Sequence, residues 1–418
     1  MRLLVISHTP HYLGTDRYCG WGPTVRELDH LAELFSDVTH IAPVYPDPPP
    51  SSALAYGSSR IRLRPVEPAG GQTPRAKAGI LATYPQYARA IGEELRRADV
   101  VHVRCPANIS LLALWLLSIN ERPAYRWVKY AGNWQPDGRE PRSYRLQRRW
   151  LAGNRHRGLV TVNGRWPDQP PHIHSFHNPC LTDEEVDAGR AAAIAKPLTS
   201  PIELLFAGAL NEGKGAGRVL QVARELQHCG VGFRLVMLGD GSDRPRYEAW
   251  TRENGLDGVT FAGWVPRADV SRYYAAAHFI LLPSRSEGWP KVLGEAMAFG
   301  AVPVAAAVSG IPQILAESRA GVALPPDDIA GMAAAIVRYL DDPGLWLEAS
   351  RAGVAMAPRF TYRAYQSAVA ELFSRAWGVI LSSPEQASAP PPAVAPAPTG
   401  HGNTRFDVWP GRAHDGDR

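Results

Sequence analysis

Short apolar runs alternate with longer amphipathic stretches through most of this chain, and this alternation is the feature that most constrains its fold. The runs have the length and composition of buried β-strands, and the stretches between them have the spacing of helices. A regular alternation of strands and helices predicts an α/β fold with parallel sheets. The predicted strands form two successive sets, at residues 2–7, 38–42, 100–103, 125–130 and 159–162, and at 202–207, 233–238, 258–261, 278–283 and 302–306.

Two sets of strands predict two Rossmann-like domains, and a length of 418 residues suits two domains better than one. A polar, alanine-rich stretch at 184–200 marks the predicted boundary, which gives a first domain at 1–196 and a second at 197–360. A one-sided apolar pattern predicts a helix in residues 361–382. Residues 383–418 are rich in Pro, Ala, Gly and charged residues, and we expect this tail to be disordered.

Composition excludes several classes of function. The net charge of +5 is a mild bias, which does not predict a nucleic-acid-binding protein. The four cysteines are scattered without a CxxC pair, as in a cytoplasmic protein with reduced thiols. The apolar run at 111–119 is too short to cross a bilayer, and the run at 2–7 is too short for a signal peptide. We therefore expect a cytoplasmic protein without a membrane span.

A glycine-rich turn joins the predicted strand at 202–207 to the helix that follows it. The turn contains Gly208, Gly213, Lys214 and Gly215. Free backbone N–H groups and the positive end of a helix dipole favour an anion at such a turn, and Lys214 adds a full charge beside them. The turn therefore predicts a site for a diphosphate. A plain turn with a solvated lysine is the structural alternative.

The spacing of this turn also fits the P-loop of nucleoside triphosphatases up to its last position. A P-loop needs a Ser or Thr hydroxyl there to coordinate magnesium, and this chain has Gly215. The missing hydroxyl disfavours a nucleoside triphosphatase.

A second glycine-containing segment, SEGWPKVLGEAMAFG at 286–300, contains two glutamates. Glu287 follows a predicted strand and precedes Gly288 and Pro290, which break the chain, so that it lies in a loop. Glu295 lies about one and a half turns into the next helix. Ligands of open α/β sheets bind at this edge, where carboxylates can accept hydrogen bonds from sugar hydroxyls. The alternative is a glutamate at the N-terminal turn of the helix together with a solvated glutamate within the helix.

With these residues the chain resembles a known family. Glu287 and Glu295 are similar to the E-x7-E motif of retaining glycosyltransferases of the GT-B fold, family 4. Further blocks resemble the family's phosphate loop, its L-V-G-D-G turn, its loop against the base and its G-G-x-P turn, in the family's order: GALNEGKG at 208–215, LGDG at 238–241, FAGWVP at 261–266 and SGIP at 309–312.

The resemblance implies two Rossmann-like domains that face each other across a cleft, with a carboxyl-terminal helix that crosses back to the first. The first domain would bind the acceptor and the second a nucleoside diphosphate sugar. The implied reaction moves the sugar to an acceptor hydroxyl with retention of configuration, in polysaccharide or glycolipid assembly, without a metal or cofactor. The acceptor would be lipid-linked or a saccharide.

The resemblance also implies a role for individual residues. Glu287 would hold the transferred sugar, Glu295 the ribose, and Lys214 the diphosphate. Glu287 and Lys214 form the predicted catalytic set. The predicted donor-binding set comprises Gly20, Gly22, Gly208, Lys214, Gly215, Trp264, Val265, Gly288, Trp289, Pro290 and Glu295.

Two positions depart from the family's pattern. Ala209 stands where the phosphate loop has an arginine, so that Lys214 would carry more of the diphosphate charge. Ala131 stands where a histidine follows the fifth strand, and alanine cannot hydrogen-bond a sugar. A nucleotide-sugar epimerase of similar fold and a binding protein without catalysis therefore remain alternatives.

Residues 142–157 contain six arginines and no acidic residue. Arg145, Arg148, Arg149 and Trp150 form a predicted acceptor or membrane patch, and a solvated basic helix is the alternative. An anionic membrane surface is thus a predicted partner, and the protein would be peripheral at the inner membrane face.

The histidines at 172, 174 and 177 have no cysteine or carboxylate partners nearby in the sequence, so we predict no metal site there. The sole D-x-D sequence, at 415–417, falls in the expected disordered tail.

Overall fold

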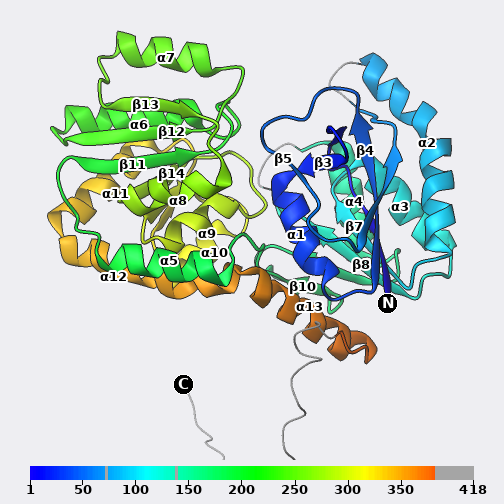
Figure 1. Ribbon diagram of the computed structural model, residues 1–418. Coiled ribbons are helices and arrows are strands. Elements are labelled where there is room, and N and C mark those ends of the chain that lie inside the picture. Colours follow the sequence, from blue (N-terminus) through cyan, green and yellow to red (C-terminus); the bar gives the residue numbers. More distant parts are fainter. Residues whose placement is uncertain (71–73, 137–139, 382–418) are drawn as a thin grey trace, which may run out of the picture. The chain divides into compact units, whose positions relative to one another are not determined.

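The computed structural model describes residues 1–70, 74–136 and 140–381, and these form one compact unit. The tail predicted to be disordered and the D-x-D sequence lie outside the described residues. The predicted division into domains at residue 196 remains a prediction. Within the described residues the strands build two separate sheets (Figure 1).

The first sheet has the strand order β10-β9-β8-β7-β1-β4-β2-β3-β5, with β6 paired to β4. Its strands run parallel except where β3 pairs with β2 and β5. The strands are β1 (Arg2–Ile6), β2 (His11–Leu13), β3 (Tyr18–Trp21), β4 (Asp37–Tyr45), β5 (Ala53–Ala55), β6 (Ile61–Val66), β7 (Val100–Cys105), β8 (Tyr125–Tyr130), β9 (Leu159–Val162) and β10 (Ile173–Ser175).

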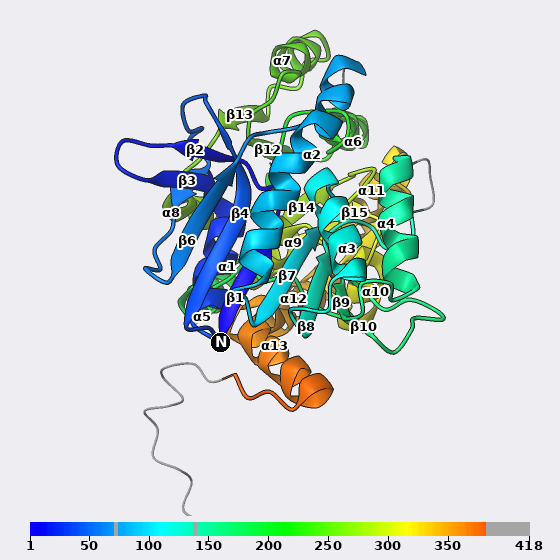
Figure 2. The same ribbon diagram turned by 90° about the vertical axis from the view of Figure 1, so that its right-hand side faces the viewer.

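Two hydrophobic clusters cover the two faces of this sheet. Its helices are α1 (Gly22–Ala32), α2 (Pro74–Leu95), α3 (Asn108–Ile119) and α4 (Arg142–Ala152). Helix α5 (Asp183–Ile194) follows them in the chain but packs with the helices of the second sheet. Residues of α2 and α3 pack on one face, and both helices lie along the strands in Figure 2. Residues of α1 pack on the other face.

The second sheet is parallel throughout, with the order β13-β12-β11-β14-β15-β16. Its strands are β11 (Ile202–Ala207), β12 (Phe233–Leu238), β13 (Val259–Gly263), β14 (Phe279–Leu282), β15 (Val302–Ala306) and β16 (Val322–Leu324). Its helices are α6 (Ala216–His228), α7 (Arg244–Glu253), α8 (Arg267–Ala276), α9 (Lys291–Ala298), α10 (Ile311–Ser318), α11 (Ile329–Asp341) and α12 (Pro343–Met356).

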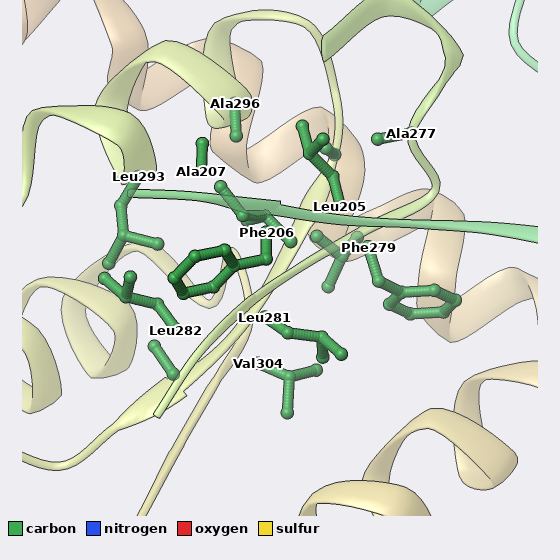
Figure 3. Packing of buried hydrophobic residues seen from close by; sticks show 14 of the residues in the cluster. Leu205, Phe206, Ala207, Ala277, Phe279, Leu281, Leu282, Leu293, Ala296 and Val304 are labelled. Carbon is green, nitrogen blue, oxygen red and sulfur yellow. The ribbon is translucent and has the colours of Figure 1, made fainter. Parts of the chain in front are cut away.

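The central strands of the second sheet are buried on both faces, which explains their continuous apolar sequence. All four residues of β14 are buried. Phe206 and Leu282 pack with Leu293 of α9 in the core shown in Figure 3. This packing fixes the carboxyl ends of β11 and β14 and the start of α9, and the loops there carry the candidate site.

The last helix, α13 (Tyr362–Trp377), returns to the first sheet. Tyr365, Val369 and Phe373 of this helix join the cluster that contains Leu3 and Leu28. The prediction of a carboxyl-terminal helix that crosses back is therefore confirmed.

The stretch predicted as a polar boundary is in large part helical. Helix α5 covers residues 183–194 and begins with a capping box between Thr182 and Glu185. This signal overrides the loop-like composition because it satisfies free N–H groups at the helix start. No helix in the described residues is long and apolar enough to cross a membrane.

Candidate active site

The two predicted catalytic side chains come from neighbouring strands of the second sheet. Chain order reverses between β11 and β14, and ligands of open α/β sheets bind at such a switch point, outside the carboxyl ends of the strands. Lys214 lies in the loop after β11, and Glu287 lies in the loop after β14. Lys214 Nζ is 2.7 Å from Glu287 Oε1. The structure thus brings together two residues that are far apart in the chain.

Hydrogen bonds between the two loops hold this pair in place. Ser284 Oγ donates to the carbonyl oxygen of Lys214 at 3.2 Å, and the amide of Arg285 donates to the carbonyl of Gly213 at 3.0 Å. Within the first loop, Asn211 Oδ1 accepts from the Lys214 amide at 2.9 Å. The sequence did not predict roles for Ser284 and Asn211, because a polar residue in a loop carries no signal of what it will bond.

The pair is asymmetric in its exposure. The Glu287 side chain is 7% exposed, whereas that of Lys214 is 39% exposed. The carboxylate is therefore fixed against the protein, while the ammonium group can turn toward a ligand without crossing the core. A site that presents a movable cation beside a held carboxylate suits a ligand with both phosphate and hydroxyl groups.

Gly215, where the P-loop pattern fails, has a steric reason to be glycine. It is the N-cap residue of α6 with φ +81°, a conformation that L side chains rarely adopt. A Cβ atom here would lie 2.3 Å from the carbonyl oxygen of Pro283. The close approach of the two loops therefore excludes the serine or threonine that a P-loop requires.

Gly215→Ser is expected to lower the free energy of unfolding by about 2 kcal/mol or more, because backbone strain adds to the clash with Pro283. Gly230→Ser is the matched control, since Gly230 also has positive φ but a Cβ atom added there would meet nothing within 4 Å. Urea unfolding of both variants measures the difference. Equal destabilisation would show that the contact with Pro283 is not limiting, and magnesium-dependent ATP hydrolysis by Gly215→Ser would revive the P-loop alternative.

At Gly288 the loop after β14 of the second sheet contacts the loop after β8 of the first sheet. A Cβ atom at Gly288 would lie 1.7 Å from the carbonyl oxygen of Ala131, in the loop after β8. Only glycine allows main chain to approach main chain so closely. The position where the family has a histidine thus contacts the glutamate loop through its carbonyl group.

Glu295 lies in a separate environment from Glu287. It is buried, and its Oε2 accepts a hydrogen bond of 2.7 Å from the Tyr274 hydroxyl, while Arg267 Nη1 bonds Oε1. Arg267 Nη2 also lies 2.8 Å from Glu185 Oε2, on α5. Both oxygens of Glu295 are therefore engaged within the protein, in a network that links α8, α9 and α5. The sequence predicted neither partner.

The aromatic residues of the predicted donor set differ in accessibility. Trp264 is 46% exposed, and Val265 beside it is partly buried. Trp289 is buried, and its ring stacks on Phe360 with centroids 4.9 Å apart. Only the main chain of Trp289 can therefore face a ligand, whereas the Trp264 side chain is available.

Gly20 and Gly22, which belong to the predicted donor-binding set, have no room for a side chain. A Cβ atom would lie 2.4 Å from His11 Nε2 at Gly20 and 2.8 Å from the Ser52 carbonyl oxygen at Gly22. Gly22 is the first residue of α1, where Pro23 follows at a favourable position. Helix α1 runs from Gly22 to Ala32.

Comparison with known proteins finds a family that part of the second half of the chain resembles. Residues 201–342 match the family described as glycosyl transferases group 1.

Curated proteins similar to this chain match it over about half of their own length. Glycogen synthase from Mycobacterium tuberculosis is 28% identical over 191 residues, which cover 45% of this chain and 46% of that protein. D-inositol 3-phosphate glycosyltransferase from Acidothermus cellulolyticus is 33% identical over 222 residues, which cover 49% of this chain and 47% of that protein. The chain thus spans about half the length of the curated relatives it matches.

Solved structures show that the whole described fold is shared with glycosyltransferases of the GT-B type. Sucrose-phosphate synthase from Thermosynechococcus elongatus has a TM-score of 0.69 and 21% identity, covering 90% of this chain and 99% of that one. Anabaena HepE in complex with UDP-glucose has a TM-score of 0.62 and 16% identity, covering 90% and 100%. The predicted fold class is therefore confirmed.

The predicted basic patch lies on helix α4, and its residues Arg145, Arg148 and Arg149 line one hollow together with Glu140. Arg148 bonds the carboxylate of Glu140, and Trp150 packs into the core cluster beside it. The exposed face of α4 carries Arg142, Arg145, Leu146 and Arg149 instead. Arg145 Nε also lies 3.7 Å from Glu140 Oε1, so this carboxylate, just outside the acid-free run, pairs with two arginines of the patch, whose role stays a prediction.

The three histidines of the H-x-H-x-x-H sequence have separate environments. His172 Nε2 lies 2.8 Å from the Leu151 carbonyl, and the His177 ring packs edge-on against Phe360. Among residues 1–70, 74–136 and 140–381, no group of three or more potential ligands is arranged to hold a metal.

Proposed function

We propose that the chain is a retaining glycosyltransferase that moves a sugar from a nucleoside diphosphate sugar to an acceptor hydroxyl. The observation that carries this proposal is the contact between Lys214 and Glu287 at the switch point of the second sheet. The match of residues 201–342 to the family described as glycosyl transferases group 1 supports sugar transfer. One structural neighbour, Anabaena HepE, was solved in complex with UDP-glucose.

The chemistry of the pair suits this reaction. Without a ligand, Lys214 and Glu287 neutralise each other. A bound donor would take over both groups, with its diphosphate on Lys214 and a sugar hydroxyl on Glu287. Negative charge then builds up on the leaving diphosphate as the sugar is released, and a preorganised cation at that place stabilises the transition state. Glu295, Trp264 and Val265 are proposed to border the nucleoside.

The direct test is a donor screen with UDP-, GDP- and ADP-sugars, with release of nucleoside diphosphate as the measurement. We expect slow hydrolysis of one donor without an acceptor and faster turnover with one. Glu287→Gln should lower turnover by about a hundredfold or more, since it removes a contact that is proposed to act in the transition state. Glu348→Gln, on the exposed face of α12, is the matched control. Unchanged turnover in Glu287→Gln would contradict the assignment.

Two alternative functions give different results in the same screen. An epimerase would convert the donor sugar without releasing nucleoside diphosphate. A binding protein without catalysis would show a thermal shift with one donor but neither hydrolysis nor transfer. The loss of the family histidine at Ala131 is the observation that keeps the second alternative in view.

We further propose a lipid-linked acceptor and a peripheral location at the cytoplasmic face of a membrane. The exposed basic face of α4, with Leu146 between Arg145 and Arg149, supports this proposal. Each basic residue near an anionic surface contributes about 1 kcal/mol, and the attraction falls as salt shortens the Debye length.

Sedimentation with anionic vesicles tests the membrane proposal. We expect binding at low salt that is reduced at least tenfold in the double variant Arg145→Glu/Arg149→Glu. The control is Arg89→Glu/Arg96→Glu, which makes the same change in net charge at two exposed positions in and after α2. If the parent protein stays in the supernatant at low salt, or if both double variants lose binding equally, α4 is a solvated face and a soluble saccharide acceptor is favoured.

A further inference from the structure

A second cluster of charged side chains lies apart from the Lys214–Glu287 pair. Its centre is Glu27 of α1, whose side chain is 1% exposed. Arg104 Nη1 lies 2.7 Å from Glu27 Oε1, and Lys129 Nζ bonds the same oxygen. Lys291 Nζ lies 3.5 Å from the other oxygen. Three cations from β7, β8 and the start of α9 thus share one buried carboxylate, and we call these four residues the Glu27 cluster.

The charges of the Glu27 cluster do not balance. The side chains of Arg104, Lys129 and Lys291 are 11%, 7% and 16% exposed, so that little water reaches them. Burial lowers the pKa of Lys129 to about 7, although Glu27 acts in the opposite direction. Even with Lys129 neutral, two cations face a single carboxylate. A buried charge without a counter-charge is costly, so an additional anion at this place would stabilise the protein.

Two further side chains, Tyr365 and His8, lie beside the Glu27 cluster. Tyr365 of α13 is 3% exposed, and its hydroxyl has no hydrogen-bond partner in the described residues. Lys129 Nζ lies 5.1 Å from the centre of the Tyr365 ring, which places this unused donor beside the cluster. His8 is exposed, yet desolvation and the charge of Arg104 lower its pKa. Because His8 is exposed and close enough to Arg104 for that charge to act on it, the cluster lies near the surface on the side of His8.

Lysine is rare in this chain, and most of its lysines lie beside Glu27 or Glu287. The chain has five lysines among 45 basic residues, at 77, 129, 196, 214 and 291. Three of these five contact Glu27 or Glu287. Lysine is a compact point charge that can move between partners, whereas arginine prefers fixed bidentate geometry. A chain that otherwise uses arginine has kept lysine at both of these carboxylates.

Lys291 is the cation in the cluster that is best placed to contact a ligand. It is the most exposed of the three and the most distant from Glu27, and its Nζ donates a single hydrogen bond in the described structure, to the Pro23 carbonyl at 3.0 Å. It begins α9, four residues after Glu287. Because residue 209 is alanine, Lys214 is the one cation of the loop at 208–215. A second positive charge close to the candidate donor site would therefore help to neutralise a phosphate ligand.

We propose that the Glu27 cluster is a second oxyanion subsite, in which Lys291 contacts a phosphate group of a substrate. The proposal rests on the proposed function, because the phosphate would come either from the donor diphosphate or from a phosphorylated acceptor. Lys291 exchanges its bond to Pro23 for the phosphate, and Arg104 and Lys129 keep the site positive behind it. The Tyr365 hydroxyl supplies a neutral donor.

Calorimetry on the full chain tests this subsite with two kinds of probe. UDP, GDP and ADP represent the donor, and glucose 6-phosphate, with glucose as its phosphate-free control, represents a phosphorylated acceptor. Lys291→Met is expected to weaken one of these phosphate ligands by at least tenfold, while Lys291→Arg recovers most of the affinity. Arg234→Met is the matched control, because Arg234 pairs with Glu203 at the opposite, amino-terminal edge of the second sheet.

The ligand that weakens identifies the source of the phosphate. Loss with the nucleoside diphosphates places the subsite on the donor, and loss with glucose 6-phosphate places it on the acceptor. If Lys214→Met weakens nucleoside diphosphate binding but folded Lys291→Met binds both kinds of probe normally, the subsite is refuted and the proposed function stands. If the parent protein binds none of the nucleoside diphosphates, it is the proposed function that fails.

The variant Glu27→Gln distinguishes a ligand-binding site from a cluster that only stabilises the fold, which we call a brace. Removal of the carboxylate leaves the cations unpaired, so the variant should be less stable without ligand. A phosphate ligand would then restore a counter-charge, and its stabilising shift in melting temperature should be larger than in the parent protein, with affinity raised at least threefold. A brace predicts loss of stability with no gain in affinity, and that result would overturn the proposal even if Lys291→Met failed to fold.

Discussion

Lys214→Met is expected to weaken nucleoside diphosphate binding by at least a hundredfold. A charge-assisted contact to phosphate contributes about 1.5–3 kcal/mol, which corresponds to about ten- to a hundredfold in affinity. The variant loses more than this contact. It also leaves Glu287 without its partner at 2.7 Å, so that an unpaired carboxylate faces the incoming diphosphate. Calorimetry with UDP, GDP and ADP measures the loss.

The double variant Lys214→Met/Glu287→Gln is the control for this electrostatic argument. Because it removes both the cation and the repelling carboxylate, it should bind nucleoside diphosphate more tightly than Lys214→Met alone. The assignment of Lys214 as the diphosphate cation would be abandoned if the single variant folded and kept the parent affinity. Equal affinities of the single and double variants would show that Glu287 does not face the diphosphate.

Gly288→Ala is expected to lower turnover by about a hundredfold, because a displacement of about 1 Å in a catalytic group costs that much. The added methyl group would lie 1.7 Å from the Ala131 carbonyl, and two main-chain segments cannot yield as a flexible side chain can. The loops after β8 and β14 must then separate and carry Glu287 with them. Turnover with the donor found in the screen is the measurement.

Gly92→Ala is the matched control for Gly288→Ala, since a Cβ atom at Gly92 in α2 would meet nothing within 4 Å. It should leave turnover unchanged. We expect both variants to fold, because neither substitution removes a core side chain. Full activity in Gly288→Ala would mean that the two loops need not touch during catalysis.

The sequence predicted the central strands of both sheets well, and physical reasons explain which strands it missed. Strands such as β11 and β14 are buried on both faces, so their apolar runs are continuous and easy to recognise. The short strands β2, β3 and β5 mix exposed and buried residues over three or four positions. A pattern that short does not distinguish a strand from a turn.

The site divides in the same way. Lys214 and Glu287 could be predicted because each lies in a recognisable loop at the carboxyl end of a strand. The Glu27 cluster could not, because its members lie at 27, 104, 129 and 291 and share no local spacing. The bonds of Glu295 to Arg267 and Tyr274 were missed for the same reason, and buried charges of this kind are too rare to expect from a sequence.

The return of α13 to the first sheet affects how this protein can be recombined with its relatives. Phe373 and Val369 of this helix are fully buried beside Leu3 of β1, so the two ends of the described chain share one core. A fragment cut at residue 196 would expose that apolar surface and should aggregate rather than fold. A chimera with a relative must therefore take residues from both ends of the described chain, and a simple crossover in the middle of the chain would join a helix to a sheet with which it did not evolve.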